Sequence, residues 1–244
     1  EKFLIKNHKI KKIIYSPDIF KENENWWTET CKNIDTIIHT AWHVKPGDYL
    51  ESSKNIDCLT GSLNLAKGAV NSKVSRFVGI GTCFEYDLTL GKLFYDTPLK
   101  PKTSYGSAKA TLFTFLSHWF PKHSVNFAWC RLFYLYGEGE NKNRLIPYIH
   151  ERLDSNKQVE LSKGNQIRDY LDIAVAGKII TEVSLGSQVG PINICSGIPI
   201  TIKQIASNIA NIQGKQHLLK FGFRPENPTD PTYVLGVPNY NIEN

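Results

Sequence analysis

Apolar residues in the first half of the chain follow two different spacings. Runs that are apolar at nearly every position, or at every second one, predict strands, whereas stretches with apolar residues three or four positions apart predict helices. The predicted strands are residues 8–16, 34–42, 75–82 and 125–137, and the predicted helices are residues 55–70 and 107–120. Strands that alternate with helices indicate an α/β fold with a parallel sheet and covered faces.

The pattern changes after residue 138, where a polar loop begins. The expected elements that follow are helices at 145–156, 168–186 and 200–214, strands at 158–163 and 190–197, and a tail at 223–241 rich in Pro and Asn. We therefore predict two units, residues 1–138 and a smaller mixed unit at 139–244 that closes a cleft over the first. Some segments of the second unit are expected to return to the first.

Composition limits the classes of function. The 244 residues are 41% hydrophobic, with a net charge of +6 and lysines scattered along the chain, which favours a solvated surface over a nucleic-acid face. No apolar run approaches membrane-spanning length, and no secretion signal opens the sequence. The odd number of cysteines, with no C-x-x-C pair, predicts reduced thiols in a cytoplasmic protein rather than disulfides or a zinc site.

Two short motifs suggest chemistry but fit a structural reading better. His39 and His43 have the spacing of a helical zinc pair, yet they continue a predicted strand and would not converge. Gly79 and Gly81 follow a strand, but no third glycine and no helix come after them. We therefore interpret neither motif as a ligand site and predict no metal.

A third motif, Tyr-x-x-x-Lys, occurs once, at Tyr105 and Lys109 near the start of a predicted helix. About one such match is expected by chance, so its spacing alone proves nothing. Thr82, with Cys83 and Glu85 beside it, lies where a strand ends some twenty residues earlier. Ligands of parallel sheets sit at such strand ends.

The order of these segments resembles the extended short-chain dehydrogenase/reductase family, in its NAD-dependent epimerase/dehydratase branch that acts on nucleotide sugars. The resemblance is carried by "IIHTA", "FVGIGT", "PKTSYGSAK" and "CRLFYLYG", and later by "RDYLDI" and "NICSGIPITIKQIA". It implies a Rossmann-like doubly wound parallel sheet with a smaller mixed α/β substrate-binding C-terminal domain. It also implies a cytoplasmic oxidoreductase.

The resemblance implies a catalytic trio. Tyr105 would be the general acid/base, and Lys109 would supply part of the positive charge that a tyrosine needs to exchange protons near neutrality. Thr82 would hydrogen-bond the sugar oxygen that Tyr105 protonates or deprotonates. Asn55 corresponds to the family's helix asparagine, although two extra residues precede Gly61 here.

The resemblance also implies binding residues. NAD or NADP would lie along Thr40, Ala41 and Trp42, with Tyr105, Lys109 and Phe133 beside it. Trp42 stands where glycine is usual, and the strand end "IIYS" does not choose between the two cofactors. The nucleotide sugar would contact Thr82 and a further set of residues, which comprises Cys83, Tyr134, Arg144, Leu145, Arg168 and Arg224.

The reaction implied is hydride transfer at a sugar carbon. Related 4,6-dehydratases carry Thr-Asp-Glu where this chain has Thr82-Cys83-Phe84, and Glu85 comes one position too late. We therefore expect reduction of a nucleotide-linked 4-keto-6-deoxyhexose, with 4-epimerisation as the alternative. A non-catalytic NAD(P)-binding regulator is a second alternative, but such proteins typically lose the Tyr/Lys pair.

Two further expectations follow from the resemblance. Members of the family begin with a G-x-x-G-x-x-G loop, and this sequence, which opens with Glu and contains no methionine, is expected to start inside the helix after that loop. Its C-terminal end is likewise expected to be cut short. A homodimer through residues 55–70 and 107–120 is also expected.

Overall fold

The core of the protein is a parallel four-stranded sheet. The computed structural model describes residue 10 and residues 12–228 and 230–240. Within them, β1 (Thr36–His39), β2 (Arg76–Thr82), β4 (Asn126–Leu132) and β8 (Gly190–Ile194) pair in the order β1-β2-β4-β8, and every pair is parallel. The carboxyl ends of these strands therefore share one edge of the sheet.

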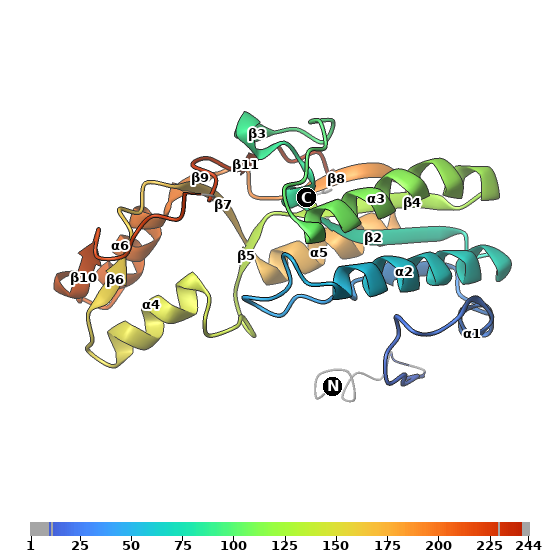
Figure 1. Cartoon of the computed structure of the whole chain (residues 1–244), viewed down its shortest axis with the longest axis horizontal. Helices are drawn as coiled ribbons and strands as arrows, with labels where there is room; N and C mark the ends of the chain where they lie inside the picture. Colours follow the sequence, from blue (N-terminus) through green and yellow to red (C-terminus); the bar gives the residue numbers. More distant parts are fainter. Residues whose placement is uncertain (1–9, 11, 229, 241–244) are drawn as a thin grey trace.

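Helices cover both faces of this sheet (Figure 1). Successive side chains of a strand point to opposite faces. Phe77 accordingly packs with α2 (Lys54–Asn71) and α3 (Ser104–Trp119), and its neighbour Val78 packs with α5 (Ile173–Leu185). This arrangement confirms the predicted Rossmann-like doubly wound α/β fold.

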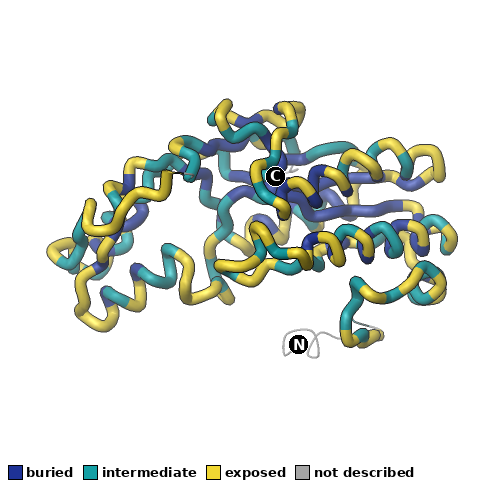
Figure 2. The backbone as a smooth tube through the Cα atoms, viewed as in Figure 1, coloured by how far each residue is buried: buried dark blue, intermediate teal, exposed yellow. Residues whose placement is uncertain are grey.

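A smaller body lies at the other end of the molecule (Figure 1). It consists of α4 (Leu145–Asp154), α6 (Ile202–Ile212) and the parallel pair β6 (Val159–Leu161) and β10 (Leu219–Phe221), which enclose an apolar cluster of their own. Figure 2 shows that the buried backbone positions are concentrated in the central sheet, while the outer turns of both bodies are exposed.

A third sheet connects the two bodies. It contains β5 (Tyr134–Tyr136), β7 (Ile167–Asp172) and β9 (Pro199–Thr201) in the order β5-β7-β9. Beyond it, β3 (Lys92–Leu93) pairs with β11 (Leu235–Gly236), which brings the tail back to the first half of the chain. Since β8 also joins the main sheet, segments beyond residue 138 contribute to both bodies.

Two predicted elements are wrong in the described residues. Residue 10 and residues 12–16 form no strand, because no described strand lies beside them to pair with; the rest of the predicted strand at 8–16 lies outside the described residues. The helix predicted at 168–186 begins only at Ile173. Its first part is β7, and Asp172 caps the helix by accepting hydrogen bonds from the amides of Ala174 and Val175.

Several short elements were not predicted. The helix α1 (Glu24–Thr30) is capped by the Asn23 side chain, which accepts a hydrogen bond from the Trp26 amide. Four 3₁₀ turns also occur in the described residues, at Cys83–Glu85, Leu88–Leu90, Phe120–His123 and Gln216–Leu218. The first of these turns follows β2 directly and shapes the site described below.

All five cysteines are buried, free thiols, as predicted from their number and spacing. The described helices include none that combines the length and apolar character needed to cross a membrane.

Candidate active site

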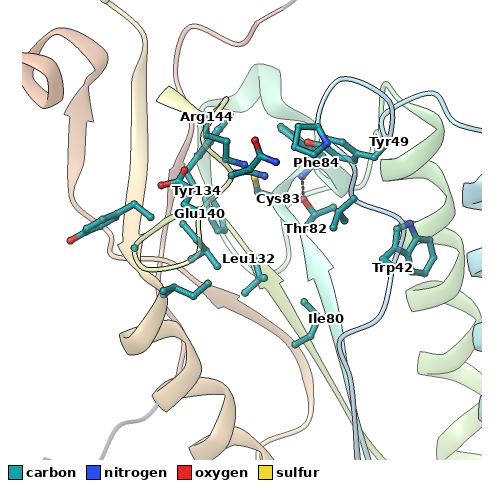
Figure 3. Close-up of a pocket in the computed structure, with 18 of the residues that line it drawn as sticks. Trp42, Tyr49, Ile80, Thr82, Cys83, Phe84, Leu132, Tyr134, Glu140 and Arg144 are labelled. Carbon is teal, nitrogen blue, oxygen red and sulfur yellow. Dashed lines mark hydrogen bonds between the residues drawn. The ribbon is translucent and has the colours of Figure 1, made fainter. Parts of the chain in front are cut away.

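A cleft of about 730 Å³ opens at the carboxyl edge of the main sheet (Figure 3). Its first wall comes from the loop after β1, the end of β2 and the first turns of α3. Its second wall comes from β5, the loop after it, the start of α4 and Tyr170 of β7. The cleft therefore lies where doubly wound sheets place their ligands.

Most of the predicted site residues line this cleft. Those that do are Thr40, Trp42, Thr82, Cys83, Tyr105, Lys109, Phe133, Tyr134, Arg144 and Leu145. Three predicted residues, Ala41, Arg168 and Arg224, do not line it. The fold thus brings together residues from positions 40 to 145, while the roles assigned to them stay predictions.

The start of α3 sets the position of Tyr105. Thr103 caps the helix by accepting a hydrogen bond from the Gly106 amide at 3.1 Å. A Cβ on Gly106 would lie 2.6 Å from the Phe84 carbonyl oxygen, so only glycine lets the helix approach the turn after β2 so closely. This close approach places Tyr105 beside Thr82.

Tyr105 is 9% exposed and surrounded by aromatic rings. The rings of Tyr49 and Trp42 meet it edge-on, with centroids 5.0 and 6.4 Å away. Burial is the main reason why the pKa of its phenol lies above the ordinary value, and a hydrogen bond with the Thr82 side chain opposes that rise. The phenol therefore keeps its proton near neutral pH, and it needs additional positive charge nearby to ionise and act as a base.

Lys109, four residues after Tyr105 in α3, is the candidate source of that charge. Its side chain is almost completely buried, and Nζ donates a hydrogen bond of 2.6 Å to the Ile80 carbonyl oxygen. Burial lowers the pKa of Lys109 to about 7, against the opposing effects of Glu85 and Cys58. The Lys109 side chain can therefore exchange between its ammonium and its neutral amine form near neutral pH.

Trp42 covers the Lys109 ammonium. The distance from Nζ to the centre of the Trp42 ring is 3.9 Å, a cation–π contact that replaces part of the lost hydration. The indole nitrogen donates to Asn55 at 2.8 Å, and the Asn55 amide donates to the carbonyls of Tyr49 and Ser52. Asn55, a predicted family position, therefore holds the loop that carries Trp42 and Tyr49.

Glu85 is a residue whose part in this wall the sequence analysis missed. Its carboxylate is completely buried and accepts hydrogen bonds from the Thr82 amide at 2.8 Å, the Trp129 indole at 3.0 Å and the Arg131 Nε at 2.7 Å. Together with Thr82 it forms a capping box around the turn. The carboxylate does not line the cleft; it fixes the backbone that presents the Thr82 hydroxyl.

The same cluster explains Gly79 and Gly81. A Cβ at Gly79 would lie 2.4 Å from the Trp129 ring, and one at Gly81 would lie 2.2 Å from the Trp129 Nε1. Both glycines lie within β2 and make room for a buried side chain. The two glycines of "GIGT" are therefore explained by the packing of Trp129 against β2.

The second wall is richer in tyrosines, and it carries the charged side chains of Glu140 and Arg144. The rings of Tyr134 and Tyr170 lie 5.6 Å apart, and Arg144 and Glu140 project from the loop beside them (Figure 3). Burial raises the pKa of Tyr170 to about 12, so its phenol keeps its proton at neutral pH. The second wall thus combines an aromatic surface with a carboxylate, which accepts hydrogen bonds, and a guanidinium, which donates them.

Arg168 and Arg224 have other partners. Arg168 is buried behind Tyr134, pairs with Asp230 at 2.7 Å and donates to the Ile167 carbonyl. Arg224 stacks on Tyr148, with its guanidinium carbon 4.5 Å from the ring centre. Neither guanidinium faces the cleft in this structure.

The two histidines of the "HTAWH" motif are held apart. His39 is buried and bonded to Ser62 at 2.8 Å, and burial lowers its pKa to about 3. His43 pairs instead with Asp48 at 2.6 Å. Across the part of the chain that the structure describes, no three His, Cys, Asp or Glu side chains gather as metal ligands would.

Comparison with known proteins identifies the class that this fold and site define. Residues 9–183 match the model of the NAD dependent epimerase/dehydratase family, which is more than half of the chain. The protein belongs to this family, as the sequence resemblance predicted.

Individual relatives narrow the picture. The chain is 25% identical over 234 residues to the dTDP-6-deoxy-L-talose 4-dehydrogenase (NAD(+)) of Aggregatibacter actinomycetemcomitans, covering 92% of this chain and 83% of that protein. Among solved structures, a UDP-N-acetylglucosamine 4-epimerase from Methanobrevibacter ruminantium matches with a TM-score of 0.80 at 19% identity, over 92% of this chain and 74% of that one. A UDP-glucose 4-epimerase from Thermotoga maritima matches with a TM-score of 0.79 at 16% identity, over 92% and 75%. The structural matches support the fold.

Proposed function

We propose that the protein is a nucleotide-sugar oxidoreductase that reduces a nucleotide-linked 4-keto-6-deoxyhexose. The observation that carries this proposal is that Thr82, Tyr105 and Lys109 line the same cleft, with a hydrogen bond between the side chains of Thr82 and Tyr105. Family membership and the relative named as a 4-dehydrogenase of a 6-deoxy sugar support the same reading.

The first wall fits the nicotinamide end of NAD. The cleft is lined by the polar side chains of Thr40, Tyr105 and Lys109 and by the apolar side chains of Leu132 and Phe133. This donor set suits ribose hydroxyls beside an apolar ring. When bound, the nicotinamide would supply or accept the hydride of the sugar carbon. We prefer NAD to NADP because the relative is named for NAD(+).

The chain's own groups would manage the proton. As the carbonyl carbon of the sugar receives a hydride, its oxygen becomes basic and takes the proton of the Tyr105 phenol. The Thr82 hydroxyl donates to the same oxygen and orients it. The Lys109 ammonium stabilises the phenolate that Tyr105 becomes, and the phenolate then recovers a proton from solvent.

Elimination of water is disfavoured. A dehydratase needs an acid and a base beside the sugar, and Cys83 and Phe84 occupy the positions after Thr82. Burial raises the pKa of the Cys83 thiol to about 12, so it is not a base at neutral pH. Glu85 accepts three donors inside the core and is not available to substrate.

The second wall would hold the sugar and its diphosphate. We propose that residues 139–244 supply most of this wall, as the domain division predicts, and that Tyr134, Leu145 and Arg144 contact the substrate. Arg168 and Arg224 stay candidates for the diphosphate, and Arg168 would first have to leave Asp230.

Epimerisation at carbon 4 is the second candidate, favoured by the two 4-epimerases among the structural matches. It uses the same trio, but the hydride returns to the other face of the sugar, so no cofactor is consumed. Reduction, in contrast, consumes one NADH for each sugar.

The test uses the full-length protein with NADH and a dTDP-4-keto-6-deoxyhexose. Reduction predicts oxidation of NADH, followed at 340 nm, and a Tyr105→Phe variant slower by about 100-fold or more. Interconversion of UDP-glucose and UDP-galactose without net oxidation of NADH would support the epimerase instead. A Tyr105→Phe variant as fast as the wild type would refute the catalytic assignment.

A further inference from the structure

One carboxylate on the second wall of the cleft has a buried oxygen without a partner. Of the residues that line the cleft, Glu140 is the one whose side chain carries such an atom within the described residues: its Oε2 is buried and accepts no hydrogen bond. A buried carboxylate oxygen that has lost water and gained no donor is costly, so such an atom indicates a site completed by a ligand.

The local backbone holds Glu140 in place. Its amide donates to the Gly137 carbonyl at 3.2 Å, which closes a tight turn between β5 and α4. Gly137 and Gly139 on either side have φ values of 138° and 82°, conformations that glycine adopts readily. The turn therefore directs the Glu140 side chain inward beside Tyr134 (Figure 3).

The surroundings of Glu140 limit the ligand chemistry. Tyr134 and Tyr170 form an aromatic surface next to it, and Arg144 is the neighbouring cation. Burial raises the pKa of Glu140, while Arg144 and the Gly137 amide lower it. A carboxylate repels the diphosphate, so its partner must be a neutral group with hydrogen-bond donors.

We propose that Glu140 is a specificity-determining residue that accepts a hydrogen bond from a hydroxyl of the bound sugar. This inference rests on the proposed nucleotide-sugar function, and it identifies a side chain that recognises the sugar ring. Arg144, four residues later, would face the anionic end of the same ligand, so the loop separates the two chemical halves of the substrate.

Binding of UDP and of UDP-glucose to the full-length protein, measured by calorimetry, tests this proposal. In the Glu140→Ala variant we expect the affinity for UDP-glucose to fall roughly 10- to 100-fold, the loss expected for a hydrogen bond to a charged group, while the affinity for UDP is unchanged. Glu138→Ala is the matched control, because Glu138 lies on the same loop and lines the same cleft but is exposed, and it should leave both affinities unchanged.

Analogues sharpen the assignment. A UDP-glucose analogue that lacks the contacted hydroxyl should bind the wild type less tightly than UDP-glucose does, and the difference should vanish in Glu140→Ala. Equal losses for UDP and UDP-glucose, no loss for either, or the same loss in Glu138→Ala would overturn the proposal. If the wild type binds UDP-glucose and the Glu140→Ala variant binds it equally tightly, only this inference fails. If the wild type binds no nucleotide sugar, the proposed function fails as well.

Discussion

The two walls of the cleft are built on different physical terms. On the first wall, around β2 and α3, the Glu85 carboxylate receives three donors, although one nitrogen of its partner Arg131, Nη2, is buried without an acceptor. On the second wall, the Glu140 carboxylate has a buried oxygen with no donor. The buried carboxylate of the first wall is therefore satisfied within the protein, whereas the carboxylate of the second wall leaves an oxygen for the ligand that we propose.

Removal of Glu85 should have the largest effect on stability. Glu85→Ala leaves the Arg131 Nε and the Trp129 indole buried without their acceptor, so we expect a loss of about 3–5 kcal/mol in the free energy of unfolding. Urea denaturation measures this loss. Glu140→Ala is the matched change on the other wall, and it should leave the free energy of unfolding unchanged or raise it, because it removes a buried oxygen that has no donor. Equal effects in the two variants would abolish the distinction between the walls.

The charge of Lys109 gives the next largest effect. Folding lowers its pKa from 10.5 to about 7, mainly through burial. Between these values the unfolded chain binds more protons than the folded one, so this residue makes the protein more stable as pH rises from 7 towards 10.5. The slope is at most about 1.4 kcal/mol per pH unit.

Urea denaturation at several values between pH 6.5 and 9.5 checks this dependence, with Lys109→Met as the reference. The difference in stability between the wild type and Lys109→Met should shift in favour of the wild type as pH increases. A difference that stays constant would mean that the buried amine keeps its ordinary pKa, and that the Lys109 end of the first wall is more hydrated than its burial suggests.

Residues of the first wall could be predicted from the sequence because they lie in short local patterns. The strand end at Thr82 and the spacing of Tyr105 and Lys109 lie on short segments, so the trio could be predicted before its geometry was known. Glu85 could not, because its partners Trp129 and Arg131 lie 44 and 46 residues away and meet it only when β2 and β4 pair.

The second wall was harder to predict for a related reason. The apolar pattern of β7 runs into that of α5 without a break, so residues 168–172 read as helix although they pair with β5 and β9. Asp172, the helix cap, was the available signal. The environment of Glu140 depends on this sheet and on a glycine turn, and neither produces a periodic spacing of apolar residues that the sequence would reveal.

The tight packing around Gly81, behind the first wall, predicts a smaller loss in the free energy of unfolding when this glycine is replaced. A Cβ at Gly81 would lie 2.2 Å from the Trp129 Nε1 and 2.5 Å from a Glu85 oxygen, so Gly81→Ala should cost about 1–3 kcal/mol by displacing the buried cluster. Gly177 in α5 is the matched control, because no atom other than those of its chain neighbours and its own helix backbone lies within 4 Å of its Cβ position. Gly177→Ala should be neutral or should stabilise by up to about 1 kcal/mol. Thermal unfolding compares the two, and a similar melting temperature for both variants would contradict the packing argument.

The smallest effect on stability should come from Arg144 on the second wall. Its side chain is exposed, and its guanidinium forms no hydrogen bond or ion pair within the described residues, so Arg144→Ala should change the free energy of unfolding by no more than about 0.5 kcal/mol. The same change should weaken UDP binding by roughly tenfold or more if the guanidinium pairs with the diphosphate. Arg152→Ala, a change on the far turn of α4 outside the cleft, should leave UDP binding unchanged. A variant of Arg144 that loses stability but keeps its affinity would show that this side chain, like Glu85 on the first wall, serves the fold rather than a ligand.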